Sequence, residues 1–263
     1  MALVNLPGDV NLNVRIDGPE GAPLLIMSNS LGASLEMWDG QIDLLTNKYR
    51  VLRYDQRGHG ASDAPKGRYS FPVLVSDVIA LMDHFGIQSA DWVGLSLGAM
   101  TGMGLAIKHP DRFGRMVLAD GRSVAMDAYK QMWDQRIIDV NDGGLEAIVK
   151  ASLGLWLTQG FRTDNPEATA AAHKMIVSTN SEGYIACCYA LRELDYFKDL
   201  PKITLPVLYL CGGDDKGAPP AEMQEMARVT PGAKYVEIPD AGHVANINQP
   251  VAFNAALAAF LDI

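Results

Sequence analysis

Cysteine is scarce in this chain of 263 residues, with only Cys187, Cys188 and Cys211. An odd number that includes an adjacent pair does not make a disulfide framework, so we expect a reducing compartment and a cytoplasmic protein. The sequence also begins without a basic segment followed by an apolar core, which argues against a signal peptide. No apolar stretch is long enough to span a bilayer, and we expect no membrane partner.

Basic residues are outnumbered, with 22 Lys and Arg against 31 Asp and Glu, for a formal net charge of −9. No run of basic residues offsets this balance, which argues against nucleic acid and anionic membranes as partners. The five histidines show no metal-ligand spacing with one another or with a cysteine. We therefore expect no metal and no cofactor.

Apolar residues, in contrast, make up 48% of the sequence, enough for a sizeable core. Their spacing predicts strands, separated by helices that include 71–85, 99–109 and 251–261. The expected strands are 10–16, at an antiparallel edge, and 23–27, 49–54, 91–93, 116–119, 207–210 and 234–238. Between 124 and 194 only helical segments are expected, at 126–140, 145–157, 167–177 and 182–194.

This order predicts an α/β fold, with a mostly parallel sheet, helices on both faces and a helical insertion. We place the core at residues 1–122 and 199–263 and a helical cap at residues 123–198.

The stretch Gly94–Gly98 is a candidate nucleophile turn, because Ser96 has a glycine two residues before and two after it. An expected strand precedes the turn and an expected helix follows it. Such a turn holds the serine backbone in a sparsely allowed conformation and exposes the hydroxyl. The helix that begins there points N–H groups toward a developing oxyanion.

A serine hydroxyl needs a base, and His243 follows the last expected strand in Asp240-Ala241-Gly242-His243. The acid that would orient the imidazole is ambiguous. Asp214 and Asp215 follow one strand end, and Asp120 follows another. From the residues alone, all three stay candidates.

Other notable side chains favour structural roles or leave two interpretations open. His59 lies in a glycine-rich loop, and a second histidine base is not needed, so we expect a structural role. The Cys187–Cys188 pair is best explained by packing. Met126, Met132 and Trp133 fall at near-helical spacing and belong either to the core or to the wall of an apolar pocket.

Several segments together resemble the α/β-hydrolase superfamily and, within it, the 3-oxoadipate enol-lactonases. They are Ser28-Asn29-Ser30-Leu31-Gly32, residues 54–62 (YDQRGHGAS), Gly94–Gly98, Met37-Trp38-Asp39, residues 132–137 (MWDQRI), residues 246–250 (NINQP) and residues 252–257 (AFNAAL). The resemblance covers nearly the whole chain. Two positions depart from the pattern: Ala218 stands where threonine is usual, and residues 120–123 are not the expected small, neutral ones.

The resemblance implies Ser96 as nucleophile, His243 as base and Asp215 as acid. It also implies that the backbone N–H groups of Leu97 and Leu31 form the oxyanion hole. The expected reaction opens a small lactone that carries a carboxylate, through an acyl-enzyme, in aromatic compound catabolism.

A negatively charged substrate needs a local cation in so acidic a protein. Arg122, at the start of the insertion, is the candidate, with Trp133 as a second substrate-binding residue. The alternative for Arg122 is a salt bridge between core and cap, to an acidic residue such as one of the first cap helix.

Other functions on the same scaffold stay open at this point. They are a carboxylesterase, a C–C bond hydrolase, a cofactor-free oxygenase and, outside enzymes, a small-ligand receptor. The expected partner is a small molecule in every case, and the sequence predicts no oligomeric state.

Overall fold

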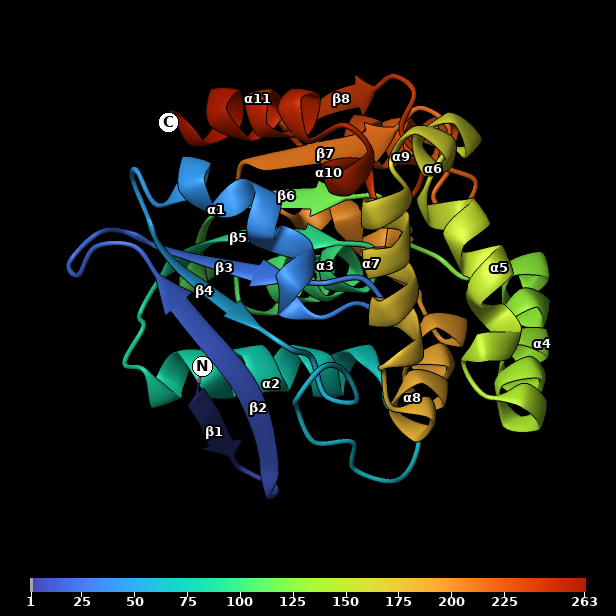
Figure 1. Cartoon of the computed structure of the whole chain (residues 1–263). Coiled ribbons are helices and arrows are strands. Elements are labelled where there is room, and N and C mark those ends of the chain that lie inside the picture. Colours follow the sequence, from blue (N-terminus) through green and yellow to red (C-terminus); the bar gives the residue numbers. More distant parts are fainter. Residues whose placement is uncertain (1) are drawn as a thin grey trace.

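A single eight-stranded sheet runs through the protein in the computed structural model, which describes residues 2–263 (Figure 1). The strand order is β1-β2-β4-β3-β5-β6-β7-β8. β2 pairs antiparallel with β1 and β4, and all other neighbours pair in parallel. The strands are β1 (Ala2–Leu6), β2 (Val10–Asp17), β3 (Leu24–Ser28), β4 (Arg50–Tyr54), β5 (Ala90–Leu95), β6 (Phe113–Ala119), β7 (Val207–Gly212) and β8 (Lys234–Ile238).

Helices cover both faces of this sheet and one of its ends. The α-helices are α1 (Asp39–Leu45), α2 (Phe71–His84), α3 (Leu97–Lys108), α4 (Asp127–Gly143), α5 (Glu146–Trp156), α6 (Gln159–Asp164), α7 (Pro166–Val177), α8 (Ser181–Arg192), α9 (Pro220–Val229), α10 (Ala245–Asn248) and α11 (Pro250–Leu261). The short 3₁₀ helices are η1 (Leu35–Trp38), η2 (Pro110–Arg112) and η3 (Phe197–Lys202).

Burial explains why the central strands are apolar along their whole length. All six residues of β7 are buried, because helices pack on both faces of that strand. One apolar cluster joins the sheet to α2, α3 and α9, and a second joins it to α1 and α11. The α/β architecture with helices on both faces is therefore confirmed.

The antiparallel end of the sheet differs from the prediction. We placed 10–16 at the edge, but β1 lies outside it and pairs residue by residue from Ala2 with Val14 to Leu6 with Val10. Only two side chains of β1, Val4 and Leu6, are buried. Helices α1, α6, α9 and α10 were also not located in advance.

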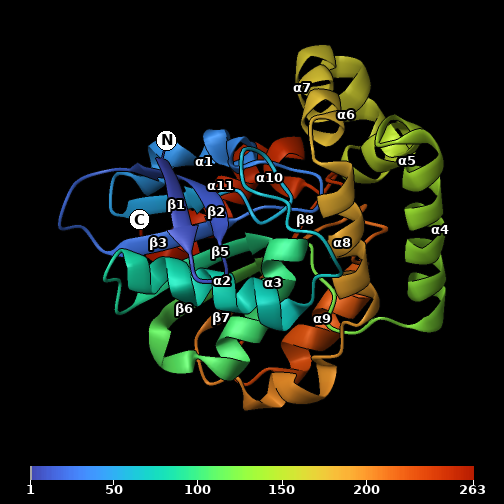
Figure 2. The same cartoon turned by 90° about the horizontal axis from the view of Figure 1, so that it is seen from below.

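Helices α4 to α8 lie between β6 and β7 in the sequence and gather beyond the carboxyl ends of the parallel strands (Figures 1 and 2). The chain enters and leaves this helical segment at neighbouring points. Ala125 N donates to Leu194 O at 2.8 Å, and Tyr196 N donates to Ser123 O at 2.7 Å. We call residues 123–198 the cap, and these exact boundaries stay a prediction. Among residues 2–263, no helix combines the length and the apolar character needed to cross a membrane.

Candidate active site

Ser96 stands in the sharp turn between β5 and α3, with a left-handed φ of 55° that few residues other than glycine adopt. The two flanking glycines are required by close backbone contacts. A Cβ on Gly94 would lie 2.3 Å from the carbonyl oxygen of Gly98, and one on Gly98 would lie 2.2 Å from that of Ser28. The turn therefore fits only between residues without side chains, and it presents the hydroxyl at the sheet end.

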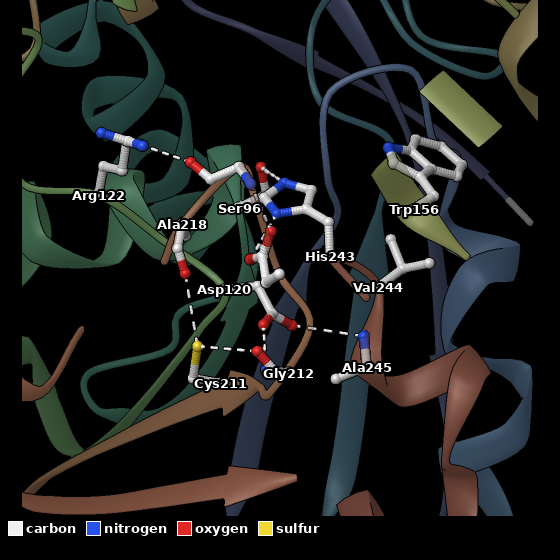
Figure 3. A network of polar contacts seen from close by, with 12 residues as sticks. Ser96, Asp120, Arg122, Trp156, Cys211, Gly212, Ala218, His243, Val244 and Ala245 are labelled. Atoms are coloured by element: carbon white, nitrogen blue, oxygen red, sulfur yellow. Dashed lines mark hydrogen bonds and ion pairs between the residues drawn. The ribbon is translucent and has the colours of Figure 1, made fainter. Parts of the chain in front are cut away.

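A chain of hydrogen bonds links Ser96 to a histidine and a carboxylate (Figure 3). Ser96 Oγ lies 2.8 Å from His243 Nε2, and His243 Nδ1 lies 2.8 Å from Asp215 Oδ2. The three residues come from the loops that follow β5, β8 and β7, and all three are buried. With the proton on Nδ1 donated to Asp215, Nε2 is free to accept the serine proton.

The three aspartates that the sequence left open occupy different environments. Only Asp215 contacts His243, and its other oxygen, Oδ1, accepts from Gly217 N at 2.7 Å. Asp120 is fully buried and accepts from Gly212 N at 2.7 Å and Ala245 N at 3.4 Å. Asp214 is exposed. The geometry therefore favours Asp215 as the acid.

The electrostatics of this group suit a general base. Burial lowers the pKa of His243, but the charge and hydrogen bond of Asp215 outweigh it, and the net pKa is raised. Burial, followed by the nearby Asp215 carboxylate, raises the pKa of Asp120 well above its ordinary value. The imidazole is therefore a stronger base than an isolated histidine side chain.

Asp120, Cys211 and Asp215 offer three ligand atoms within 4.8 Å of one another, which is close enough to hold a metal ion. Their hydrogen bonds argue against that role. The carboxylate oxygens accept from backbone N–H groups and from His243. Burial also raises the pKa of the Cys211 thiol, which keeps it protonated, whereas a metal ligand would be a thiolate. We assign no metal to this cluster.

Two backbone N–H groups next to the serine have no acceptor within residues 2–263. One belongs to Leu97, the first residue of α3, and the other to Leu31 in the loop after β3. Gly98 N donates to Asn29 O at 3.2 Å and so connects this loop to the serine turn. Two unsatisfied donors, one at a helix N-terminus and one in a neighbouring loop, are the arrangement that an oxyanion hole requires.

The site opens into a cavity of about 430 Å³ between the sheet and the cap. Ser96, His243 and Leu31 line it from the core, and Trp133, Met126 and Met132 line it from the cap. Met126 is 62% exposed and Met132 is 40% exposed, so these two methionines border the cavity and do not belong to the core. A cavity of this size suits a small organic substrate.

Arg122 lines the cavity, but its charge is already paired. Its guanidinium lies within 2.9 Å of Glu222 in α9, contacts the Gly217 carbonyl and stacks 4.8 Å above the ring of Tyr129 in α4. The ion pair of Arg122 therefore lies within the core and is not the salt bridge between core and cap that one interpretation predicted; Arg122 contacts the cap only by stacking on Tyr129. Trp133 packs edge-on against the same Tyr129, at 5.7 Å between ring centroids.

A second arginine on the cavity wall was not singled out from the sequence. Arg136 projects from α4, and its Nη1 donates to Ser152 Oγ in α5 at 2.7 Å. Within residues 2–263, no carboxylate lies within 4.0 Å of its guanidinium. Two sequence signals could have indicated it: Arg136 falls one helical turn after Trp133, and it lies in residues 132–137 (MWDQRI), one of the segments that carry the family resemblance.

The remaining candidates from the sequence lie away from the reacting atoms. Cys187 and Cys188 are fully buried in α8, within an apolar cluster shared by core and cap. His59 is also fully buried, and its Nε2 accepts from Gly32 N at 2.9 Å.

Comparison with known proteins agrees with this geometry. Residues 23–250 match the model of a family described as having the alpha/beta hydrolase fold. This chain belongs to the α/β-hydrolase family. It is 39% identical to 3-oxoadipate enol-lactonase 2 of Acinetobacter baylyi, over 96% of this chain and 94% of that protein.

Two solved structures extend the comparison. The enol-lactonase from Burkholderia xenovorans LB400 superposes with a TM-score of 0.96 at 37% identity and covers 100% of both chains. A thermophilic esterase from Thermogutta terrifontis superposes with a TM-score of 0.92 at 28% identity, over 99% of this chain and 97% of that one. The predicted resemblance to the enol-lactonases is thus confirmed.

Proposed function

We propose that this enzyme, an ester hydrolase by its family and relatives, opens a small carboxylate-bearing lactone similar to 3-oxoadipate enol-lactone. The observation that carries the proposal is the hydrogen-bonded series Ser96–His243–Asp215 at the floor of a cavity that also holds the unpaired cation Arg136. Relatives named as enol-lactonases support this substrate. We propose with it a role in aromatic compound catabolism in the cytoplasm.

The chemistry follows from the order of the contacts. His243 Nε2 takes the proton of Ser96 as Oγ attacks the lactone carbonyl, and Asp215 stabilises the imidazolium that forms. The N–H groups of Leu31 and Leu97 bind the carbonyl oxygen as it becomes negative.

The ring C–O bond then breaks, and the protonated His243 gives its proton to the leaving oxygen. An enol released in this way tautomerises to a ketone, which makes ring opening irreversible in practice. Water activated by the neutral His243 then hydrolyses the acyl-enzyme and frees Ser96.

We infer where the substrate carboxylate binds from the pairing of the two arginines that line the cavity. The net charge of −9 repels an anion, so binding needs a cation that no protein carboxylate has already neutralised. Arg122 is paired with Glu222, whereas Arg136 forms no ion pair with residues 2–263 and donates to the Ser152 hydroxyl. We therefore propose Arg136 as the carboxylate ligand, with Arg122 as a weaker contact and Trp133 as the apolar wall beside it.

A carboxylesterase for neutral substrates is the second candidate, since an esterase shares this fold at 28% identity. It would use the same serine, base and oxyanion donors without Arg136. A C–C bond hydrolase and a ligand receptor stay possible uses of the fold, but no contact in the cavity favours them.

A panel of lactones and esters, followed by proton release, separates these candidates. We expect the wild type to prefer an anionic enol-lactone over its neutral methyl ester. Arg136→Gln should raise KM for the anionic lactone roughly 10- to 100-fold, the loss expected for a charge-assisted hydrogen bond. It should leave a neutral acetate ester nearly unchanged.

Two matched variants test whether the effect is local. Arg122→Gln should raise KM less than Arg136→Gln, because Glu222 already neutralises that side chain. Arg228→Gln removes the same charge from an exposed pair with Glu225 on α9 and should have no effect. If the wild type does not prefer the anionic lactone, the esterase becomes the better assignment. If Arg136→Gln impairs hydrolysis of the anionic lactone and the neutral ester equally, the role of Arg136 is structural.

A further inference from the structure

His59 is buried like His243 but is not part of the hydrogen-bonded series Ser96–His243–Asp215. Both of its ring nitrogens have hydrogen-bond partners. Nε2 accepts from Gly32 N at 2.9 Å, and Nδ1 lies 3.2 Å from the carbonyl oxygen of Arg57. A carbonyl only accepts and a backbone N–H only donates, so these contacts require a neutral ring with its proton on Nδ1. Burial, the strongest influence, lowers the pKa of His59 and favours this neutral form.

The loop that His59 contacts is the one that carries the Leu31 N–H group. Residues 30–33 form a hydrogen-bonded turn in which Ala33 N donates to Ser30 O at 3.1 Å. Gly32, its third residue, has a φ of +78°, the value that a type II turn requires at this position. The central peptide of such a turn has two orientations, and an acceptor on the side of the Gly32 N–H stabilises one of them.

Two more hydrogen bonds attach the same loop to residues 55–59. Gln56 Nε2 donates to Asn29 O at 2.6 Å, and Leu35 N donates to Asp55 Oδ1 at 2.6 Å. The contact of His59 lies between these two attachments in the sequence, because Gly32 falls between Asn29 and Leu35. It is therefore the only side chain among these three that accepts from a peptide of the turn itself.

We propose that His59 is a positioning residue for the oxyanion hole, because it accepts the Gly32 N–H and so holds the turn that presents the Leu31 N–H to the substrate oxygen. The inference rests on the proposed function, in which Leu31 supplies one of the two oxyanion donors. His59 itself does not touch the reacting atoms. Its loss should weaken transition-state binding more than substrate binding.

Two substitutions at this position separate the hydrogen bond from the packing. His59→Leu removes the acceptor but still fills the buried space with a side chain. His59→Gln instead offers an amide oxygen that can accept from the Gly32 N–H. We expect His59→Leu to lower kcat about 10- to 100-fold with KM within about twofold, a fraction of the loss when an oxyanion donor is deleted. His59→Gln should recover most of that activity.

Ser62→Ala is the matched control for damage to the loop. Ser62 Oγ donates to Asp55 O at 2.7 Å and accepts from Asn13 N at 2.8 Å, away from the turn at 30–33. This variant should lose thermal stability without a change in kcat. A trifluoromethyl ketone, which forms a tetrahedral adduct with the serine, should bind His59→Leu more weakly in proportion to the lost kcat/KM.

Several outcomes would overturn the inference. They are unchanged kcat in His59→Leu, equal losses in the leucine and glutamine variants, or a similar loss of kcat in Ser62→Ala. If His59→Leu does not fold, ¹⁵N-histidine NMR of the wild type decides: a proton on Nδ1 supports the contact, and a proton on Nε2 refutes it. If the enzyme does not act on the proposed lactone, the rate at which a fluorophosphonate modifies Ser96 can be measured in place of kcat. The role of His59 can therefore be tested even if the proposed substrate is wrong.

Discussion

Replacing Asp215 by asparagine should disable His243 without moving it, and the structure indicates how. Asp215 Oδ1 accepts from Gly217 N at 2.7 Å while Oδ2 faces His243 Nδ1 at 2.8 Å. An asparagine amide has one acceptor and one donor end. Because the Gly217 N–H requires the acceptor, the NH₂ group is left facing Nδ1. The imidazole then carries its proton on Nε2 and cannot accept one from Ser96.

The size of the loss follows from these contacts. If the asparagine amide flips, its oxygen faces His243 and the tautomer with the proton on Nδ1 is restored. The Gly217 N–H then faces the NH₂ group, another donor, at a cost of about 1–3 kcal/mol. The neutral amide also no longer stabilises the imidazolium. Together we expect kcat/KM to fall about 10³- to 10⁴-fold, which corresponds to roughly 4–5.5 kcal/mol of transition-state free energy.

Initial rates of proton release from the lactone measure this loss, and two neighbouring aspartates serve as controls. Asp120→Asn should cost less than about tenfold, because the Asp120 oxygens face the N–H groups of Gly212 and Ala245 and not His243. Asp214→Asn, on an exposed side chain, should change nothing. A larger loss for Asp120→Asn than for Asp215→Asn would refute the assignment of the acid.

Two further predictions concern the nucleophile and the base. Ser96→Ala should lower turnover by several orders of magnitude, and mass spectrometry should find a fluorophosphonate on Ser96 of the wild type alone; a fully active alanine variant would end this mechanism. His243 must be neutral to accept a proton, and its pKa is raised, so kcat/KM should fall on acidification through an apparent pKa above about 6.5. A profile that stays flat down to pH 5 would contradict the strong coupling of His243 with Asp215.

The fold was predictable where burial left a clear pattern in the sequence. Strands such as β7 are apolar throughout because both faces are covered, and helix α2 showed one apolar face, with Leu74, Val78 and Leu81 buried. β1 escaped notice because only Val4 and Leu6 of its five residues point inward. Likewise α6 has six residues, none of them buried. Short elements with so few buried side chains carry too little periodicity to be recognised.

The candidate site was predictable in proportion to how local each signal is. Ser96 is marked by glycines two residues away, but the acid depends on which of two strand ends approaches His243. β6 and β7 are neighbours in the sheet, and aspartates follow both, so position after a strand could not separate Asp120 from Asp215, and only the family resemblance indicated Asp215. The ion pair of Arg122 joins residues 100 positions apart, and no local pattern reveals it.

The residues around Ser96 and the residues of the opposite cavity wall come from different parts of the fold. This explains why similarity to known enzymes predicts the reaction better than the substrate. Ser96, Asp215, His243 and the two proposed oxyanion donors lie in the core, at or just after the carboxyl ends of parallel strands. The cavity wall opposite them, including Trp133 and Arg136, comes largely from helices of the cap. A substitution in α4 can therefore change which ester or lactone fits while the bond-breaking step stays the same. On this reasoning, the guanidinium of Arg136, which pairs with no carboxylate of residues 2–263, says more about the substrate than the proposed catalytic residues do.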